Sequence, residues 1–122
     1  MQIRGRSELV ALLVEGRFPI EPIRGELAQY PWDAEEPLFF LRREHAGAVL
    51  QRFVHGELSA AQVASWAAAL ELRDDVGFTD QDSAALQRLI FVLANPEING
   101  DLTFESARAL LAALEAEPLD IP

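Results

Sequence analysis

Apolar residues recur every three or four positions through most of the second half of the chain, which is the spacing of one face of an α-helix. In residues 42–55 this face consists of Ala46, Val49, Leu50 and Phe53. Three later stripes have the same spacing: Val63, Trp66, Ala67 and Leu70; Leu86, Leu89, Ile90 and Leu93; and Phe104, Ala107, Leu110, Leu111 and Leu114. The pattern predicts a four-helix portion over residues 42–117, with each stripe facing a common core.

Start and stop signals separate these four helices. Ser59 and Gln62 match the capping box, in which the hydroxyl and the amide side chain each satisfy one free backbone N–H. The other signals are stops at Gly56 and at Asn95-Pro96, and N-terminal caps at Thr103 and at one of Thr79, Asp80 and Asp82. The connections are short, so consecutive helices are expected to pack antiparallel.

The first third of the chain is less regular. Ser7 is a candidate cap for a helix over residues 8–15 that Gly16 ends, and a second short helix fits residues 23–30. Prolines at positions 19, 22, 31 and 37 make the rest a connector, in which residues 31–37 resemble an ordered turn anchored by Trp32. Residues 38–41 are compatible with a short extended piece, but no strand partner is evident.

The fold predicted from these patterns is all-α. A single domain over residues 1–122 combines short helices and a proline-rich connector (residues 1–41) with the four-helix portion (residues 42–117). We expect a small bundle of about five to six helices.

Composition places the chain among globular proteins, because half of its residues are apolar and a quarter are charged. The longest apolar runs, such as residues 89–94, are far below the roughly 18 residues that a membrane span needs. The arginine-containing N-terminus lacks the uninterrupted apolar stretch and cleavage site of a signal peptide. With no cysteine in the chain, disulfides and zinc–thiolate sites are excluded. We therefore expect a cytoplasmic protein that does not contact membranes.

Charge is the compositional outlier. The net charge is −10, and all ten basic residues are arginine. Residues 1–24 hold four arginines against three glutamates, whereas residues 25–122 hold six arginines against seventeen acids. Such acidity repels nucleic-acid phosphates and attracts a basic protein surface. The alternative is that the acidity serves solubility alone.

No catalytic pattern is present. The two histidines, His45 and His55, lie ten residues apart on one predicted helix, so they point from different faces. The sequence contains no paired-histidine metal motif, no nucleophile elbow and no glycine-rich phosphate loop. We predict a protein that is not an enzyme and that needs no cofactor.

Two acidic turns remain as candidate partner-binding segments. Trp32 stands among Asp33, Glu35 and Glu36, and it is either a lid over the core or an exposed recognition residue, since tryptophan is common at interface hot spots. The other turn contains Glu71, Asp74 and Asp75. Its two aspartates follow a helix C-terminus, where negative charge is slightly unfavourable. Either Arg73 pairs with one of them or a partner protein uses them.

Residues 95–106 resemble an EF-hand calcium loop in outline. Oxygen-bearing side chains occur at the first, third, fifth and seventh positions of this segment and also at its eleventh position: Asn95, Glu97, Asn99, Asp101 and Glu105. Gly100 fits the sixth position, but Ser106 replaces the bidentate glutamate at the twelfth. The pattern therefore favours a tight turn at Asn99-Gly100 followed by a helix that Thr103 caps.

The segment formed by residues 50–67 and continued by residues 70–76 carries a Gly-Glu-Leu-Ser turn between two helices. It resembles the helical colicin-like immunity proteins of bacteria and their uncharacterised relatives. The resemblance implies a small acidic helical protein that neutralises a basic toxin by covering its active site. The function we predict is a non-catalytic protein-binding module, and the resemblance implies one of the immunity or inhibitor type.

Two alternatives stay open. One is a calcium-responsive module that uses the loop of residues 95–106. The other is a structural or homo-oligomeric protein in which Trp32, Phe39 and Phe40 form a self-association patch.

Overall fold

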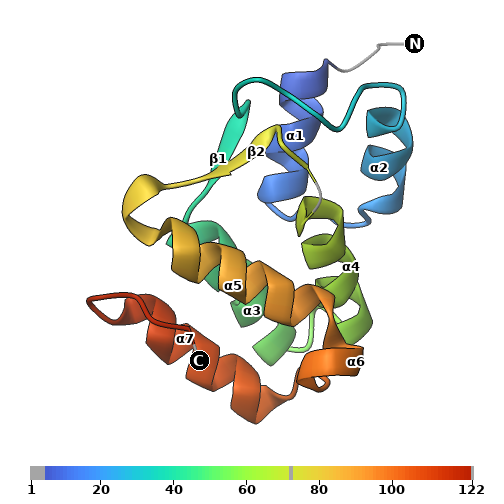
Figure 1. Ribbon diagram of the computed structural model, residues 1–122. Helices are drawn as coiled ribbons and strands as arrows, with labels where there is room; N and C mark the ends of the chain where they lie inside the picture. Colours follow the sequence, from blue (N-terminus) through green and yellow to red (C-terminus); the bar gives the residue numbers. More distant parts are fainter. Residues whose placement is uncertain (1–4, 72, 122) are drawn as a thin grey trace.

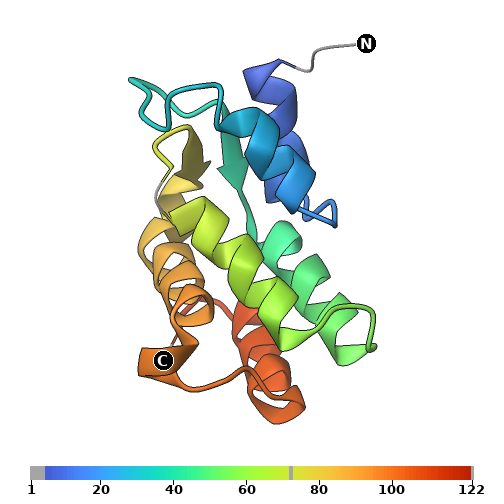
Figure 2. The ribbon, with the colours of Figure 1, turned by 90° about the vertical axis from the view of Figure 1, so that its right-hand side faces the viewer.

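The computed structural model describes residues 5–71 and 73–121; residues 1–4, 72 and 122 of the predicted domain lie outside this description. The elements, in chain order, are α1 (Arg6–Val14), α2 (Glu21–Leu27), β1 (Phe39–Leu41), α3 (Arg43–Val54), α4 (Ala60–Glu71), β2 (Val76–Phe78), the 3-10 helix η1 (Asp80–Asp82), α5 (Ser83–Ala94), α6 (Pro96–Asn99) and α7 (Phe104–Glu115). Helices α1 and α2 lie at one end of the molecule with the proline-rich connector, and α6 lies toward the other end (Figures 1 and 2). Helix α4 packs on α5, and α3 packs on α7.

The helical stripes form the core as predicted, with one exception. All apolar positions named for α3, α4 and α5 are buried, as are Ala107, Leu110 and Leu114 of α7. Leu111 is half-buried. Phe104 is wrong as a core residue, because its ring is 55% exposed at the start of α7, where it contacts the ring of Phe53.

Two predicted caps are confirmed by their hydrogen bonds. The Gln62 backbone N–H donates to Ser59 Oγ at 3.1 Å, and the Ser59 N–H donates to Gln62 Oε1 at 2.8 Å. The Ser106 N–H donates to Thr103 Oγ1 at 3.0 Å, so Thr103 caps α7. Ser7 is not a cap, because α1 already begins at Arg6 with Gly5 at the N-cap position.

The prediction of an all-α fold is wrong in one respect, because the molecule also contains a small sheet. Strands β1 and β2 pair in parallel, with Phe39 opposite Val76 and Leu41 opposite Phe78. Parallel strands need a long crossover connection, and here helices α3 and α4 together provide it. The extended piece at residues 38–41 therefore does have a partner, about 37 positions further along the chain. The fold is mostly helical with this two-stranded addition.

Side chains from α3 and α4 capture the C-terminal end of α1. The buried Trp66 indole Nε1 donates to the Leu13 carbonyl at 2.7 Å. Arg52 Nη1 donates to the Gly16 carbonyl at 2.8 Å, and its guanidinium lies over the Phe18 ring, 5.4 Å from the centroid. The Leu13 carbonyl also accepts the Gly16 N–H at 3.0 Å, so the indole adds a second hydrogen bond there. The two side-chain bonds fix the end of α1 on the rest of the core.

Candidate functional site

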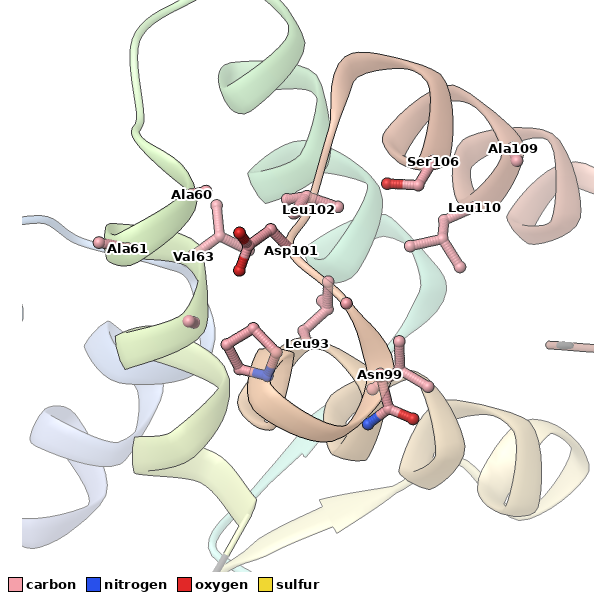
Figure 3. A pocket seen from close by; sticks show the side chains of 14 residues that line it. Ala60, Ala61, Val63, Leu93, Asn99, Asp101, Leu102, Ser106, Ala109 and Leu110 are labelled. Carbon is pink, nitrogen blue, oxygen red and sulfur yellow. The ribbon is translucent and has the colours of Figure 1, made fainter.

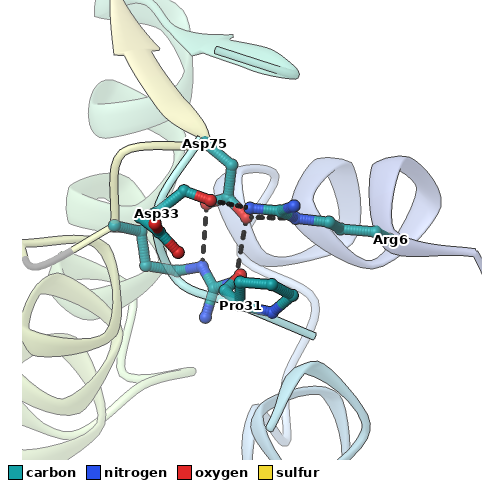
Figure 4. Close-up of polar contacts among 5 residues, drawn as sticks. Arg6, Pro31, Asp33 and Asp75 are labelled. Atoms are coloured by element: carbon teal, nitrogen blue, oxygen red, sulfur yellow. Dashed lines mark hydrogen bonds and ion pairs between the residues drawn. The ribbon is translucent and has the colours of Figure 1, made fainter. Parts of the chain in front are cut away.

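One buried carboxylate organises the region around both acidic turns (Figure 4). Asp75 is fully buried, and it accepts hydrogen bonds from Arg73 Nε at 2.9 Å, from Arg73 Nη2 at 2.8 Å and from Arg6 Nε at 3.0 Å. Both guanidinium groups also reach the connector, since Arg6 Nη2 donates to the Asp33 carbonyl at 2.7 Å and Arg73 Nη2 to the Pro31 carbonyl at 3.5 Å. Asp75 thus links α1, the connector and the turn after α4.

Backbone hydrogen bonds bring the two acidic turns side by side. The Asp74 N–H donates to the Trp32 carbonyl at 3.1 Å, and the Leu38 N–H donates to the Asp75 carbonyl at 2.7 Å. The turn of residues 31–37 is therefore held against the turn after α4, although about forty positions separate them in the sequence. This adjacency joins two sequence candidates into a single surface.

The candidate residues differ in what they present to solvent. Trp32 is 60% exposed, which matches a recognition residue better than a lid over the core. The exposed acidic residues of the two turns, apart from Glu71 at the end of α4, are Asp33, Glu35, Glu36 and Asp74. We call these five residues the Trp32 face.

Two predicted residues do not belong to this face. Asp75 is wrong as a partner-contacting residue, because its carboxylate is buried and occupied by Arg6 and Arg73. Pairing with Arg73, the structural alternative, is what the geometry shows. Glu71 is exposed, and its carboxylate accepts a hydrogen bond from Asn95 Nδ2 at 3.0 Å, which directs it toward the α5–α6 junction.

An apolar hollow of about 470 Å³ adjoins the Trp32 face. Its lining includes Trp32 itself together with Leu13 of α1, Leu27 of α2 and Ala69 of α4, and Arg24 lies at its edge. A concave apolar surface beside an exposed indole allows a large side chain of another molecule to be desolvated there. Sequence periodicity gave no sign of this hollow, because its walls come from three helices and the connector.

The use of arginine inside the fold makes the exposed surface more acidic than the composition implies. Three arginines donate hydrogen bonds to buried acceptors: Arg6 and Arg73 to the Asp75 carboxylate, and Arg52 to the Gly16 carbonyl. Arg43 binds Asp82 through two hydrogen bonds of 2.8 Å. Arg43 also donates to the Leu114 and Ala116 carbonyls at the end of α7. The hydrogen bonds of these arginines stabilise the fold and occupy their guanidinium groups.

The Arg43–Asp82 pair corrects the sequence assignment of Asp82 as a helix cap. Asp82 occupies the N-cap position of α5, but its side chain makes no capping hydrogen bond. The hydrogen bonds from Arg43 instead lower the pKa of the Asp82 carboxyl and raise that of the guanidinium. Asp82 is thus a structural residue that ties α5 to α3.

The segment of residues 95–106 does not have the geometry of an EF-hand loop. Residues 96–99 form helix α6, and its last residue, Asn99, donates through Nδ2 to the Asn95 carbonyl at 3.1 Å. The Asn95 amide donates out of the segment, to the Phe91 carbonyl at 2.9 Å and to Glu71 Oε2 at 3.0 Å. Gly100 follows at the C-cap of α6 with φ of 91°, so the turn predicted at Asn99-Gly100 takes the form of the end of a short helix. In residues 5–71 and 73–121, no group of three or more histidine, aspartate or glutamate side chains is placed to hold a metal ion.

The two histidines occupy different environments. His45 is half-buried, and its Nδ1 accepts a 3.0 Å hydrogen bond from the Arg42 backbone N–H at the start of α3, whereas His55 is exposed. Burial lowers the pKa of His45. Since its acceptor nitrogen is used as a helix cap, His45 is a structural residue in its neutral form.

The chain has no match among protein families, curated proteins or solved structures. Within the described residues, no helix has both the length and the apolar character to cross a membrane. The Trp32 face and the surfaces around it therefore carry the functional interpretation.

Proposed function

We propose that this chain is a non-catalytic protein-binding module that docks a basic partner protein through the Trp32 face. The observation that carries the proposal is that two distant turns meet around a 60% exposed tryptophan and leave four exposed carboxylates beside it. Leaving an indole in water is costly unless a partner covers it, because burial of an aromatic side chain is among the largest contributions to interface energy.

The chemistry of the face favours a basic partner. Glu35 and Glu36 take part in no hydrogen bond or ion pair within the described chain, so both carboxylates are available to lysine or arginine of another molecule. Acidic groups around an apolar centre speed the encounter with a cationic surface and fix its orientation. The adjoining hollow of about 470 Å³ would receive an apolar side chain of the partner.

An immunity or inhibitor protein is the kind of module we favour. The Gly-Glu-Leu-Ser turn between α3 and α4, the helical fold and the net charge of −10 support this proposal. Such a protein would neutralise its partner by occupying a cationic active site.

Site-specific photo-crosslinking in cells of the source organism tests the proposal. A benzophenone amino acid would replace Trp32 or Glu36 and, as controls, the exposed Gln87 and Ala112 on α5 and α7. We expect the two positions of the Trp32 face to give an adduct with one basic protein and the control positions to give none. Adducts at the control positions alone, or an adduct with an acidic protein, would contradict the proposal.

Self-association through the same end of the molecule is a second candidate, and the exposure of two apolar side chains next to the face favours it. Leu38 and Phe40 are 40% and 43% exposed, whereas Phe39, part of the predicted patch, is half-buried against the core. Sedimentation velocity at two concentrations decides this candidate, since a monomer at both would remove it.

A further inference from the structure

A second cavity lies away from the Trp32 face. Its volume is about 650 Å³, and it is bounded by the start of α4, the end of α5, the segment of residues 96–102 and α7 (Figure 3). In the ribbon views this segment and the proline-rich connector occupy opposite ends of the molecule (Figures 1 and 2). The cavity is thus separate from the surface proposed above.

The walls of this groove are apolar and made mostly of short side chains. Ala60 and Val63 of α4 lie across the cavity from Ala109 and Leu110 of α7, with Leu93 of α5 between them. Ala61 and Ala64 of α4 also line it. Alanines at these positions leave room for the backbone of an inserted segment to come close to both helices. A volume of this size is within the range of pockets that bind ligands.

Asp101 is the charged residue of the lining. Its carboxylate is exposed, and no arginine or histidine of the described chain pairs with it. The other polar side chains of the lining are already engaged, Asn99 with the Asn95 carbonyl and Ser106 with Thr103. The charge of the groove is therefore that of a single carboxylate, and Asn99 Oδ1 remains as an uncharged acceptor beside it.

Apolar surface continues beyond the groove. Ile98 is 69% exposed on α6 and Phe104 is 55% exposed at the start of α7, and the exposed carboxylates of Glu97 and Glu105 stand beside them. The cavity alone could hold a small molecule, but these exposed apolar side chains lie outside its lining, and the charges beside them are negative.

We propose that this groove binds a basic amphipathic helix of a partner protein, with aliphatic side chains entering the cavity and a lysine or arginine meeting Asp101. The charge complementarity and the extension of apolar surface to Ile98 and Phe104 favour a polypeptide. This inference goes beyond the proposed function, because it adds a second surface that acts without Trp32.

A titration followed by two-dimensional ¹⁵N–¹H NMR tests the inference with a defined probe. The probe is a helix-forming peptide of leucine and lysine, and its counterpart replaces each lysine by glutamate. We expect the lysine peptide to shift the amide signals of Ala64, Asp101 and Leu102 at concentrations where the glutamate peptide shifts none. Shifts confined to residues 31–37 and 74, or shared by both peptides, would overturn the inference.

Matched substitutions separate the groove from the general acidity of the chain. Ala109→Phe fills the cavity and should weaken peptide binding by about tenfold or more, whereas Ala112→Phe, one turn further along α7 and outside the lining, should not. Asp101→Asn should weaken binding by about two- to fivefold and Glu115→Gln should leave it unchanged. Unaltered binding by Ala109→Phe, with its fold verified by circular dichroism, would overturn the inference.

The variant Trp32→Ala separates a failure of peptide binding in the groove from a failure of docking on the Trp32 face. Peptide binding in the groove should survive Trp32→Ala, and adducts at position 32 should survive Ala109→Phe. Loss of peptide binding in Trp32→Ala would place the peptide on the Trp32 face and overturn the inference while leaving the proposed function intact.

Discussion

Arg6 Nε lies 3.0 Å from Asp75 Oδ2, although 69 positions separate the two residues in the chain. Arg73 completes the cluster by binding both oxygens of the same carboxylate. A buried carboxylate is tolerated only where its charge is paired and its lone pairs accept hydrogen bonds, and two arginines meet both conditions here. The cluster fixes the two turns that form the Trp32 face.

The Asp75 cluster predicts a strong and local effect on stability. Asp75→Asn removes the charge that two part-buried arginines share, so we expect the free energy of unfolding to fall by about 3 kcal/mol. Asp74→Asn, at the exposed neighbouring position, should change it by less than about 0.5 kcal/mol. Urea denaturation of both variants measures the difference. Equal effects would show that the cluster does not stabilise this end of the fold.

Gly77 in β2 predicts a steric effect on the connector. A Cβ at this position would lie 2.7 Å from Cε1 of Phe40 and 2.8 Å from Cβ of Pro37. Gly77→Ala should therefore destabilise the protein by about 1–3 kcal/mol, because the proline ring cannot turn aside. Gly47→Ala, in the interior of α3 with open space around it, should stabilise by about 0.5–1 kcal/mol. Thermal denaturation of the pair checks the opposite signs.

The two tryptophans predict separable fluorescence. In Trp66→Phe only the exposed Trp32 emits, so neutral acrylamide should quench its fluorescence strongly, whereas in Trp32→Phe the buried Trp66 should be protected. Trp66→Phe also removes the indole hydrogen bond to the Leu13 carbonyl, which keeps only the Gly16 N–H, and creates a cavity, so it should cost about 2–3 kcal/mol. Equal quenching of the two variants would contradict the exposure of the Trp32 face.

His45 predicts a pH dependence of stability. Its folded-state pKa is lowered by burial, so the unfolded chain binds the proton more readily, and the stabilisation is lost as the pH falls through about 6.5 toward the folded-state pKa. His45→Gln keeps an acceptor for the Arg42 N–H but cannot titrate, so its free energy of unfolding should vary less between about pH 7 and pH 5. The control His55→Gln, at an exposed position, should keep the wild-type slope. A slope that persists in His45→Gln would contradict the assignment.

Elements of this fold could be predicted from the sequence where the interacting residues are close together in the chain. The apolar stripes of α3, α4 and α5 and the capping pairs at Ser59 and Thr103 depend on residues three or four positions apart, so periodicity identified them. The β1–β2 pairing joins two three-residue strands across two helices, and such short strands carry no alternating pattern. Local sequence therefore did not contain the information for the sheet.

In the candidate site too, features that depend on neighbouring residues were predictable and features that depend on distant residues were not. Trp32 and its acidic neighbours were evident from composition, but the burial of Asp75 was not, since nothing in the run Arg73-Asp74-Asp75 distinguishes its two aspartates. The hydrogen bond from Arg6 distinguishes Asp75 from Asp74, and Arg6 lies 69 positions earlier in the chain. The one available signal was the clustering of arginine among acids, which indicates internal ion pairs without naming their members.

The affinity of the chain for the protein crosslinked at position 32, measured by calorimetry with the purified pair, tests the central claim most directly. Reversal of the two free carboxylates in Glu35→Lys/Glu36→Lys should weaken binding by about 100-fold at low salt, and Glu115→Lys should have little effect. For the wild-type chain, the affinity should also fall steeply as the salt concentration rises. An affinity that neither the double reversal nor salt changes would contradict docking of a basic partner on the Trp32 face.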